Sequence, residues 1–366
     1  MSDFFPLKNP QPDIEKFIKV IKRKEVAEKP PFVELFIDPE VMGFIWENLI
    51  GKKWISPDPA DVENMKKYYL QCIEFWYRMG YDYIRVAGGL DFPFRYRETE
   101  DTAELKRGKR IWMEEGKGMI SSWEELESYP WEEVEDKNPW YYEFVAENLP
   151  PGMGMFICPS SGILEVTVHQ LLGYENLCYL LYDDPELVEE VFKRVGEMIY
   201  RFYKKMLHLP RLAGFFQGDD LGFKTSTLIS PEALRKYVLP WHKKIAELAH
   251  ENNLLYIFHA CGNLESLMDD LIEEVRIDAK HSFEDEIMPV TEFKKKYGDR
   301  VGVLGGVDVD KLARLDEESL RKYVRNILKE CMPGGGYALG SGNSIANYIP
   351  PRNYLIMLEE GLTWRE

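Results

Sequence analysis

The amino-acid sequence predicts an α/β protein built on a (β/α)8 TIM barrel. Three observations lead to this fold class. Short apolar runs alternate along the chain with amphipathic segments of helical periodicity. Each apolar run ends in a glycine-rich or polar patch, where a strand would give way to a loop. Eight such runs are present, and parallel strands need a helical crossover to return to the same edge of a sheet.

The expected strands are short and apolar. In chain order they cover residues 32–37, 81–86, 154–158, 212–217, 254–258, 277–283, 301–304 and 336–339. The same alternation of strand and helix also builds an open, doubly wound parallel sheet, which is the structural alternative.

Helices between these strands carry recognisable start and stop signals. Asp184 and Ser230 each precede a proline and an amphipathic segment, and Asp316 precedes a third such segment. Pro240 should kink or interrupt the second of these helices, because proline lacks the backbone N–H. The glycines at 334–336 should end the third helix.

We expect the whole chain, residues 1–366, to form a single domain with two additions to the barrel. Residues 1–30 are predicted to contribute an N-terminal helical extension packed outside the barrel. Residues 93–151 follow the second strand and are charged, aromatic and rich in turns, with Trp112 among their four tryptophans. We interpret this segment as an insertion beside the barrel mouth, formed by a hairpin and short helices.

Composition and charge exclude several functional classes. The 366 residues include 46 Lys and Arg against 63 Asp and Glu, a net charge of −17, and 45% are hydrophobic. This composition is globular, and the acidic excess disfavours nucleic-acid or membrane-surface partners. No export signal and no apolar stretch of about 20 residues is visible, so we expect a cytoplasmic protein. The five scattered cysteines fit reduced thiols.

Candidate functional residues gather at the carboxyl ends of the expected strands, which form the active-site face of such barrels. These ends are unusually polar. In chain order they offer Glu34, Asp38, Arg85, Ser160, Ser161, Glu165, Asp219, Asp220, His259, Cys261, His281, Glu284, Asp285, Asp308, Ser341 and Asn343.

The sharpest local motif pairs His259 with Cys261 at the end of the fifth expected strand. Imidazole and thiolate together favour zinc. The alternative is a buried thiol beside a hydrogen-bonded histidine. Further metal ligands would come from other strand ends, and the candidates there are Asp219, Asp220, Glu165, His281 and Glu284.

Two pairs of titratable residues are candidates for catalysis. Asp219 and Asp220 follow a glycine after an apolar strand, where one carboxylate usually faces the mouth and could act as a base or bind metal. The alternative for either residue is a helix or turn cap. His281 and Glu284 alternate along a strand end, and a structural salt bridge with Lys280 or Arg300 is the alternative there.

Substrate contacts are expected from other mouth residues. The candidates are Glu34, Arg85, Phe223, Ser341 and Asn343. The glycines around Ser341 give a backbone that can approach a ligand closely, and aromatic side chains such as Phe36, Phe223 and Phe283 could stack against it. The excess of carboxylates over Arg85 favours a neutral or weakly anionic ligand.

Several segments resemble the uroporphyrinogen decarboxylase superfamily. They are GDDLGFKTSTLISPEALRKYVLPWHKKI, FHACGNL, GGVDVDKL and GGGYALGSGN followed by IPPRNY. The resemblance runs in order from about residue 154 to the C-terminus and implies a (β/α)8 fold. It also implies either the haem-pathway decarboxylase or one of the cobamide-dependent methyltransferases of that superfamily, which include zinc enzymes and enzymes that demethylate methoxylated aromatics.

The resemblance favours the methyltransferase branch. The decarboxylase carries an arginine-rich loop after its first strand, where this chain has Glu34-Leu35-Phe36-Ile37-Asp38. In thiol-methylating members the His-x-Cys motif supplies two zinc ligands, which match His259 and Cys261. Their third ligand is a cysteine at the position that here holds Ser341, so an oxygen ligand, for which we take Glu165, would complete the site.

These inferences combine into one leading hypothesis. We expect a methyltransferase that moves a methyl group between a small substrate, such as a methoxylated aromatic, and a corrinoid carried by a partner protein, with zinc assistance. The expected partners are thus a small-molecule methyl donor or acceptor and a corrinoid protein, with a homodimer as a candidate assembly. The alternatives are uroporphyrinogen decarboxylation and a non-catalytic binding barrel.

Overall fold

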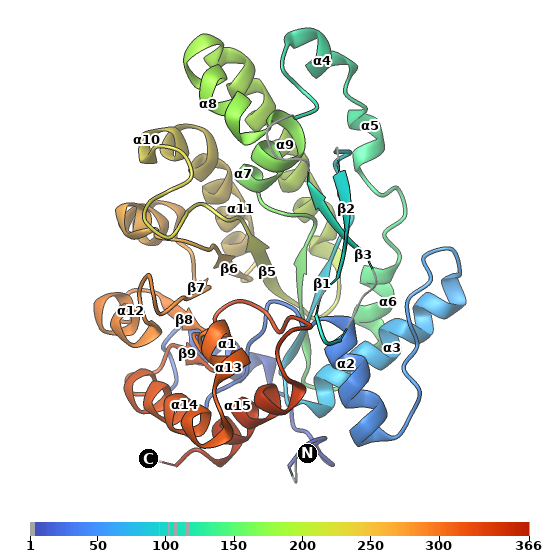
Figure 1. Ribbon diagram of the computed structural model, residues 1–366, viewed down its shortest axis with the longest axis vertical. Coiled ribbons are helices and arrows are strands. Elements are labelled where there is room, and N and C mark those ends of the chain that lie inside the picture. Colours follow the sequence, from blue (N-terminus) through green and yellow to red (C-terminus); the bar gives the residue numbers. More distant parts are fainter. Residues whose placement is uncertain (1–3, 95, 102, 106–108, 114–117, 366) are drawn as a thin grey trace.

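The computed structural model describes residues 4–94, 96–101, 103–105, 109–113 and 118–365. Seven parallel strands form one curled sheet, with helices around it (Figure 1). In sheet order the strands are β1 (Tyr83–Ala87), β4 (Gly154–Cys158), β5 (Leu212–Gly218), β6 (Leu255–His259), β7 (Ala279–His281), β8 (Gly302–Leu304) and β9 (Tyr337–Ala338). Each strand lies beside the next one along the chain, without the reversal of order that marks a doubly wound sheet. The architecture is therefore a TIM-barrel-like α/β fold.

The first expected strand, residues 32–37, is a correction to the sequence prediction. This segment forms isolated parallel bridges, Phe32 with Leu339 and Ile37 with Ile345, and no regular strand. On its other side the backbone N–H of Glu34 donates to the hydroxyl of Tyr83 over 2.9 Å. A side chain of β1 thus occupies the place where a backbone ladder would run.

The helices lie mostly between successive strands of the sheet. They are α1 (Ile14–Ile21), α2 (Pro39–Ile45), α3 (Val62–Arg78), α4 (Trp123–Ser128), α5 (Trp131–Val134), α6 (Tyr141–Asn148), α7 (Ile163–Glu165), α8 (Tyr174–Asp183), α9 (Pro185–Lys205), α10 (Pro231–Ala233), α11 (Leu239–Glu251), α12 (Val290–Tyr297), α13 (Val309–Arg314), α14 (Glu317–Cys331) and α15 (Pro351–Thr363). Short 3-10 or π-helical segments cover Trp46–Ile50, Val166–Leu172, Met206–His208, Leu234–Val238, Glu265–Leu267 and Asp270–Val275.

The predicted helix signals are confirmed. The side chains of Asp184, Ser230 and Asp316 each accept a hydrogen bond from a backbone N–H in the first turn of the helix that follows. Pro240 stands at the start of α11, directly after the π-helical segment Leu234–Val238, so the predicted interruption is present. The glycines after α14 adopt positive φ angles, which end that helix.

The N-terminal helix α1 covers the amino end of the sheet instead of lying in the outer helical layer. The ring of Phe17 lies 5.5 Å from that of Tyr83, the first residue of β1, and 6.1 Å from that of Phe156 in β4. Ile14 fills the space beside Gly154, the first residue of β4. Helix α1 therefore covers the amino ends of β1 and β4.

The segment 93–151 contains an antiparallel hairpin and three helices. The hairpin consists of β2 (Tyr96–Glu100) and β3 (Lys109–Met113), and α4, α5 and α6 follow it. In the view of Figure 1 the hairpin is drawn beside β1. Parts of this segment lie outside the described residues, as does the side chain of Trp112.

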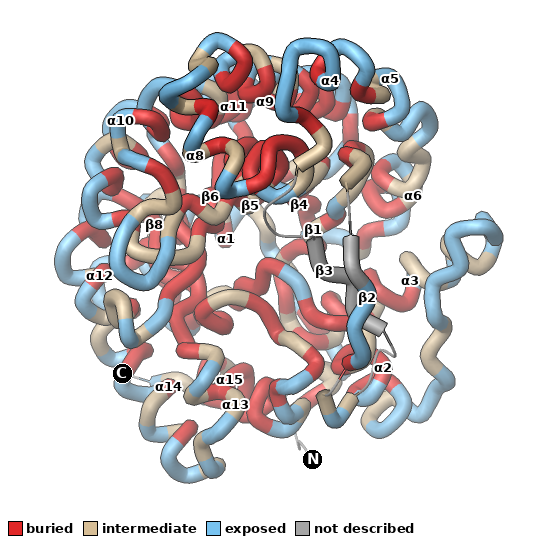
Figure 2. The backbone as a smooth tube through the Cα atoms, turned by 45° about the horizontal axis from the view of Figure 1, so that its top comes forward, coloured by how far each residue is buried: buried red, intermediate tan, exposed pale blue. Residues whose placement is uncertain are grey.

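The core follows the inner ring of the fold. Buried backbone segments line the strands, whereas exposed segments lie along the outer helices and loops (Figure 2). No helix in the described part of the chain is both long and apolar enough to cross a membrane.

Candidate metal centre and active site

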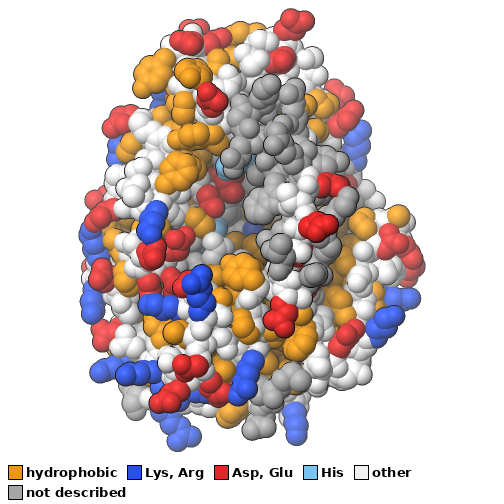
Figure 3. Space-filling view, in the orientation of Figure 1, with side chains coloured by type: hydrophobic (Ala, Val, Ile, Leu, Met, Phe, Trp, Pro, Cys, Tyr) orange, Lys and Arg blue, Asp and Glu red, His pale blue; other side chains and the backbone are white. Residues whose placement is uncertain are grey.

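A cavity of about 310 Å³ opens at the carboxyl end of the sheet. Its walls come from the segment 32–37, from the ends of β1, β4, β5 and β6 with the loops that follow them, and from the loop after β9. They are Leu35, Phe36, Arg85, Ala87, Cys158, Ser160, Ser161, Glu165, Gly218, Asp220, His259 and Asn343. In the space-filling view a hollow opens on this face, with acidic and histidine side chains at its floor (Figure 3). Seven of the strand-end residues predicted as site candidates therefore line one cavity; they are Arg85, Ser160, Ser161, Glu165, Asp220, His259 and Asn343.

His259, Cys261 and Asp220 converge at this cavity. His259 is the last residue of β6, and its Nε2 lies 3.6 Å from the Sγ of Cys261 and 3.6 Å from Oδ1 of Asp220. The three ligand atoms all lie within 4.8 Å of one another. Imidazole, thiolate and carboxylate form a donor set suited to zinc. The residues present therefore fit a zinc ion, with Asp220 in the place that the sequence analysis gave to Glu165.

Gly262 allows this convergence. Its φ of +88° lies in the left-handed region, and a Cβ there would come within 2.2 Å of the backbone of Gly222. The loops after β5 and β6 can therefore touch. As a result the backbone N–H of Cys261 donates to Oδ1 of Asp220 over 2.8 Å, which fixes the carboxylate beside the thiol.

The thiol of Cys261 has two further polar neighbours. Nδ2 of Asn343 donates to its Sγ over 3.2 Å, and Oγ of Ser282 lies 3.3 Å away. Burial raises the pKa of this thiol, and the Asp220 carboxylate adds to the rise. A bound cation would oppose both effects, because it favours the thiolate. Asn343, predicted to bind substrate, lines the cavity, and its amide also reaches the sulfur.

His281 supports His259 from the neighbouring strand. The two residues are partners in the parallel register of β6 and β7, and their Nδ1 atoms lie 2.7 Å apart. Burial lowers the pKa of His259 to about 4 and that of His281 well below its ordinary value. Both rings are therefore neutral near pH 7. His281 is buried behind His259 and does not line the cavity.

Asp219 has a different environment from its neighbour Asp220. It is fully buried, and its carboxylate accepts hydrogen bonds from the backbone N–H groups of Leu164 and Glu165 and from Nε2 of His242. His242 in turn contacts the hydroxyl of Tyr256 at 2.7 Å. The catalytic role expected for Asp219 is therefore corrected: it holds the start of α7, which is the capping alternative.

Glu165 lies in the cavity wall but outside the group of three candidate ligands. Burial raises its pKa to about 8, and the carboxylates of Asp220 and Asp219 add to the rise. The backbone N–H of Gly162 donates to its side chain over 3.4 Å. It remains available to whatever enters the cavity.

Glu34 and Ser341, both expected to bind substrate, bind each other instead. The backbone N–H of Ser341 donates to Oε1 of Glu34 over 2.8 Å, and its hydroxyl donates to Oε2 over 2.5 Å. Both residues are fully buried. Burial raises the pKa of Glu34 to about 8, against the opposing effect of these hydrogen bonds. The pair joins the first segment of the barrel to the last, and the expected substrate role is corrected.

The other expected contacts divide into two groups. Arg85 lines the cavity, and its Nε donates to the carbonyl of Phe216 over 3.1 Å while the guanidinium lies over that ring. Phe223 does not line the cavity; it is half exposed and packs edge-on against Tyr174. Glu284 is exposed, and it lines a smaller pocket nearby.

The strand ends around β8 and β9 are mostly occupied by structural bonds. Asp308 caps α13 and accepts a hydrogen bond from the backbone N–H of Asp285. Asp285 is itself paired with Lys311 and Tyr323. Asp38 accepts from the backbone N–H of Asn347.

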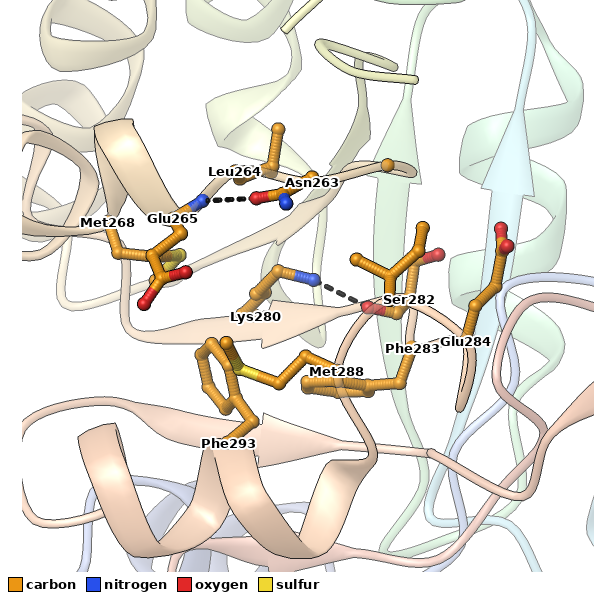
Figure 4. Close-up of a pocket in the computed structure, with 12 residues that line it drawn as sticks. Asn263, Leu264, Glu265, Met268, Lys280, Ser282, Phe283, Glu284, Met288 and Phe293 are labelled. Carbon is orange, nitrogen blue, oxygen red and sulfur yellow. Dashed lines mark hydrogen bonds between the residues drawn. The ribbon is translucent and has the colours of Figure 1, made fainter. Parts of the chain in front are cut away.

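The smaller pocket, of about 50 Å³, holds a buried lysine that the sequence analysis did not place in the site. Nζ of Lys280 donates to the carbonyl of Ser282 and lies 4.4 Å from the centre of the Phe283 ring (Figure 4). Burial lowers its pKa to about 8. Ser282 has a φ of +85°, an unfavourable angle for serine, so Lys280 stabilises the backbone that brings Ser282 to Cys261. Its position within the expected strand 277–283 is the sequence feature that could have pointed to this buried lysine.

Comparison with known proteins identifies the family. Residues 166–361, more than half of the chain, match the family described as uroporphyrinogen decarboxylase (URO-D). The chain belongs to this family. The part of the chain that matches the family includes Asp220, His259 and Cys261. The family resemblance read from the sequence is confirmed.

Relatives of this URO-D family chain include a methyltransferase. A methylated-thiol–coenzyme M methyltransferase of Methanosarcina mazei is 26% identical over 183 residues. The match covers 50% of this chain and 46% of the relative, so the chain spans about half the length of the curated relative it matches.

Solved structures show the same fold. A methyltransferase from Methanosarcina mazei superposes with a TM-score of 0.68 at 14% identity, over 96% of this chain and 98% of that one. A Listeria monocytogenes protein described as a vitamin-B12-independent methionine synthase reaches 0.53 at 10% identity, over 93% and 100% of the two chains. At these identities the likeness concerns the fold alone.

Proposed function

We propose that this URO-D family protein is a zinc-assisted methyltransferase that moves a methyl group between a small substrate and a corrinoid carried by a partner protein. The observation that carries the proposal is the convergence of Asp220, His259 and Cys261 on an open cavity. The match to a methylated-thiol methyltransferase supports the reaction class.

Asp220, His259 and Cys261 would hold the metal. When bound, zinc would act as a Lewis acid toward an oxygen or sulfur atom of the substrate. Asn343 would orient the Cys261 sulfur through its amide hydrogen bond. Glu165, in the same wall, is the candidate for a further oxygen ligand or a substrate contact.

The cavity suits a small substrate with little net charge. Asp220 and Arg85 line it with opposite charges, and Glu165, whose pKa burial raises to about 8, is protonated near pH 7. The one arginine among the described residues of this wall cannot pair with the several carboxylates of a polycarboxylate, so most of them would lie unpaired in the cavity. Phe36, which is 44% exposed at the rim, offers an aromatic face to a planar donor. A ligand set with one thiolate leaves zinc a stronger Lewis acid than a set with two, which favours a methoxylated aromatic as the methyl donor. The name of the curated relative favours a methylated thiol.

The test uses purified protein loaded with zinc, with free Co(I) cobalamin as the methyl acceptor. A panel of methoxyaromatics, methylated thiols and methylamines is offered, and methylation of cobalt is followed by absorbance. Methyl transfer from one donor class, lost in Cys261→Ala, is the expected result. Decarboxylation of uroporphyrinogen without any methyl transfer would contradict the proposal and favour the decarboxylase. Inactivity in both assays would favour a binding protein.

A further inference from the structure

The paired histidines of β6 and β7 form the least explained feature of the candidate metal centre. His259 and His281 are register partners, their ring centroids lie 5.0 Å apart, and their Nδ1 atoms are separated by 2.7 Å. His281 is fully buried and His259 is 5% exposed. This short contact between two nitrogens restricts where protons can be.

A contact of 2.7 Å between two imidazole nitrogens requires one proton in the gap. Two lone pairs would repel, and two N–H groups would collide. A neutral histidine carries its proton on one nitrogen only. If Nδ1 of His259 holds the shared proton, its Nε2 presents a lone pair; if Nδ1 of His281 holds it, Nε2 of His259 carries a hydrogen and cannot bind a metal.

The direction of Nε2 decides which arrangement a metal requires. In His259, Nε2 is the atom that faces Asp220 and Cys261, each 3.6 Å away. We propose that His281 is the positioning residue of this centre: it accepts the hydrogen bond from Nδ1 of His259 and so fixes Nε2 as a ligand atom. This inference rests on the proposed metal centre.

The surroundings of His281 suit it to this role. In this role His281 carries its own proton on Nε2, which is buried and has no hydrogen-bond partner among the described residues, so the contact with His259 alone sets its tautomer. Gly305 packs closely, since a Cβ there would lie 3.2 Å from Nε2. Phe216 contacts the ring edge-on at 5.5 Å. Packing holds the ring in place, while its Nδ1 stays free to accept from His259.

The experiment compares two variants at the same position. His281→Asn keeps an acceptor near the place of Nδ1, because its side-chain carbonyl has similar reach, whereas His281→Leu removes it. Zinc affinity is measured by competition with a chromophoric chelator, and the Co(II)-substituted proteins give ligand-field spectra. We expect His281→Leu to bind zinc about 10- to 100-fold more weakly and His281→Asn to restore affinity and the spectrum.

Controls separate this role from general destabilisation. His250→Asn alters a histidine that pairs with Asp278 far from the centre, and it should leave zinc affinity unchanged. Should the leucine variant fail to fold, His281→Gln replaces it. The longer side chain places its amide near the position of Nε2 and leaves no acceptor at the position of Nδ1, so this variant should also bind zinc weakly.

Three outcomes would overturn the inference. Equal zinc affinity of wild type and His281→Leu would overturn it and leave the metal centre standing. Equal losses in the folded asparagine and leucine variants would show that hydrogen-bond acceptance is not what matters. A wild-type protein that binds no zinc would overturn both this inference and the proposed metal centre, which distinguishes the two failures.

Discussion

The two sides of the barrel mouth use similar polar residues in different ways. After β5 and β6, Asp220, His259 and Cys261 bring their ligand atoms within 4.8 Å of one another, beside a cavity that Asp220 and His259 line. On the side of β8, β9 and the first segment, Glu34 and Ser341 bind each other in the core. The contrast teaches that a polar residue at a strand end is a candidate for chemistry when its neighbours leave its donor atoms open toward a cavity. Where neighbours occupy those atoms, the residue stabilises the fold.

The largest expected effect is the loss of zinc binding on the side of His259 and Cys261. Replacing His259 or Cys261 with alanine should abolish stoichiometric zinc binding and methyl transfer, because each removes one of three converging ligand atoms. The barrel should remain folded, since its stability resides in the strand and helix packing. Metal analysis and far-UV circular dichroism measure the two properties. Retention of full zinc content by both variants would show that the ligands lie elsewhere.

A comparison of Asp219 and Asp220 tests the contrast between adjacent residues. Asp219→Ala should lower the free energy of unfolding by about 2–4 kcal/mol, because it leaves buried donors of Leu164, Glu165 and His242 without an acceptor. Asp220→Ala should change it by about 1 kcal/mol or less but weaken zinc binding. Denaturant unfolding and chelator competition give both quantities. The reverse pattern would contradict the roles given to the two carboxylates.

On the side of β8 and β9, the buried Glu34 should make the free energy of unfolding depend on pH. Burial raises the pKa of Glu34 from 4.5 to about 8. Between these two pH values Glu34 therefore holds a proton in the folded protein but has lost it in the unfolded chain. Stability from this residue is fully present below the ordinary pKa and is lost as pH rises toward 8, by a few kcal/mol in total.

Glu34→Gln should remove that dependence, because glutamine does not ionise. Free energies of unfolding measured across this interval for both proteins give the difference directly. Parallel curves for wild type and Glu34→Gln would mean that Glu34 is ionised in the folded state.

The smallest effect is expected at Asn343, which lies between the two sides. Asn343→Ala removes the amide that donates to Sγ of Cys261, so zinc affinity should fall by about tenfold with little change in unfolding. Asn343→Gln is the matched control that keeps an amide. If the alanine variant matched wild type in zinc affinity, this hydrogen bond would have no part in holding the sulfur.

The sequence by itself was sufficient for the family, for seven of the expected strands and for the helix starts at Asp184, Ser230 and Asp316. These depend on periodicity and on local caps, which act over a few residues and are visible in one segment. The first expected strand, residues 32–37, was predicted incorrectly, because the hydroxyl of Tyr83 accepts a hydrogen bond from the backbone N–H of Glu34 where a strand partner was expected. No local pattern in residues 32–37 encodes that contact.

Tertiary structure alone decided which polar residues share a site. Asp219 and Asp220 are neighbours in sequence, yet only the packing of α7 and the Gly262 turn shows that one caps a helix and the other meets Cys261. The 2.7 Å contact of His259 with His281 likewise depends on the register of β6 and β7. Hydrogen-bond satisfaction and burial arise from contacts between distant segments, so they become visible only when those segments are brought together.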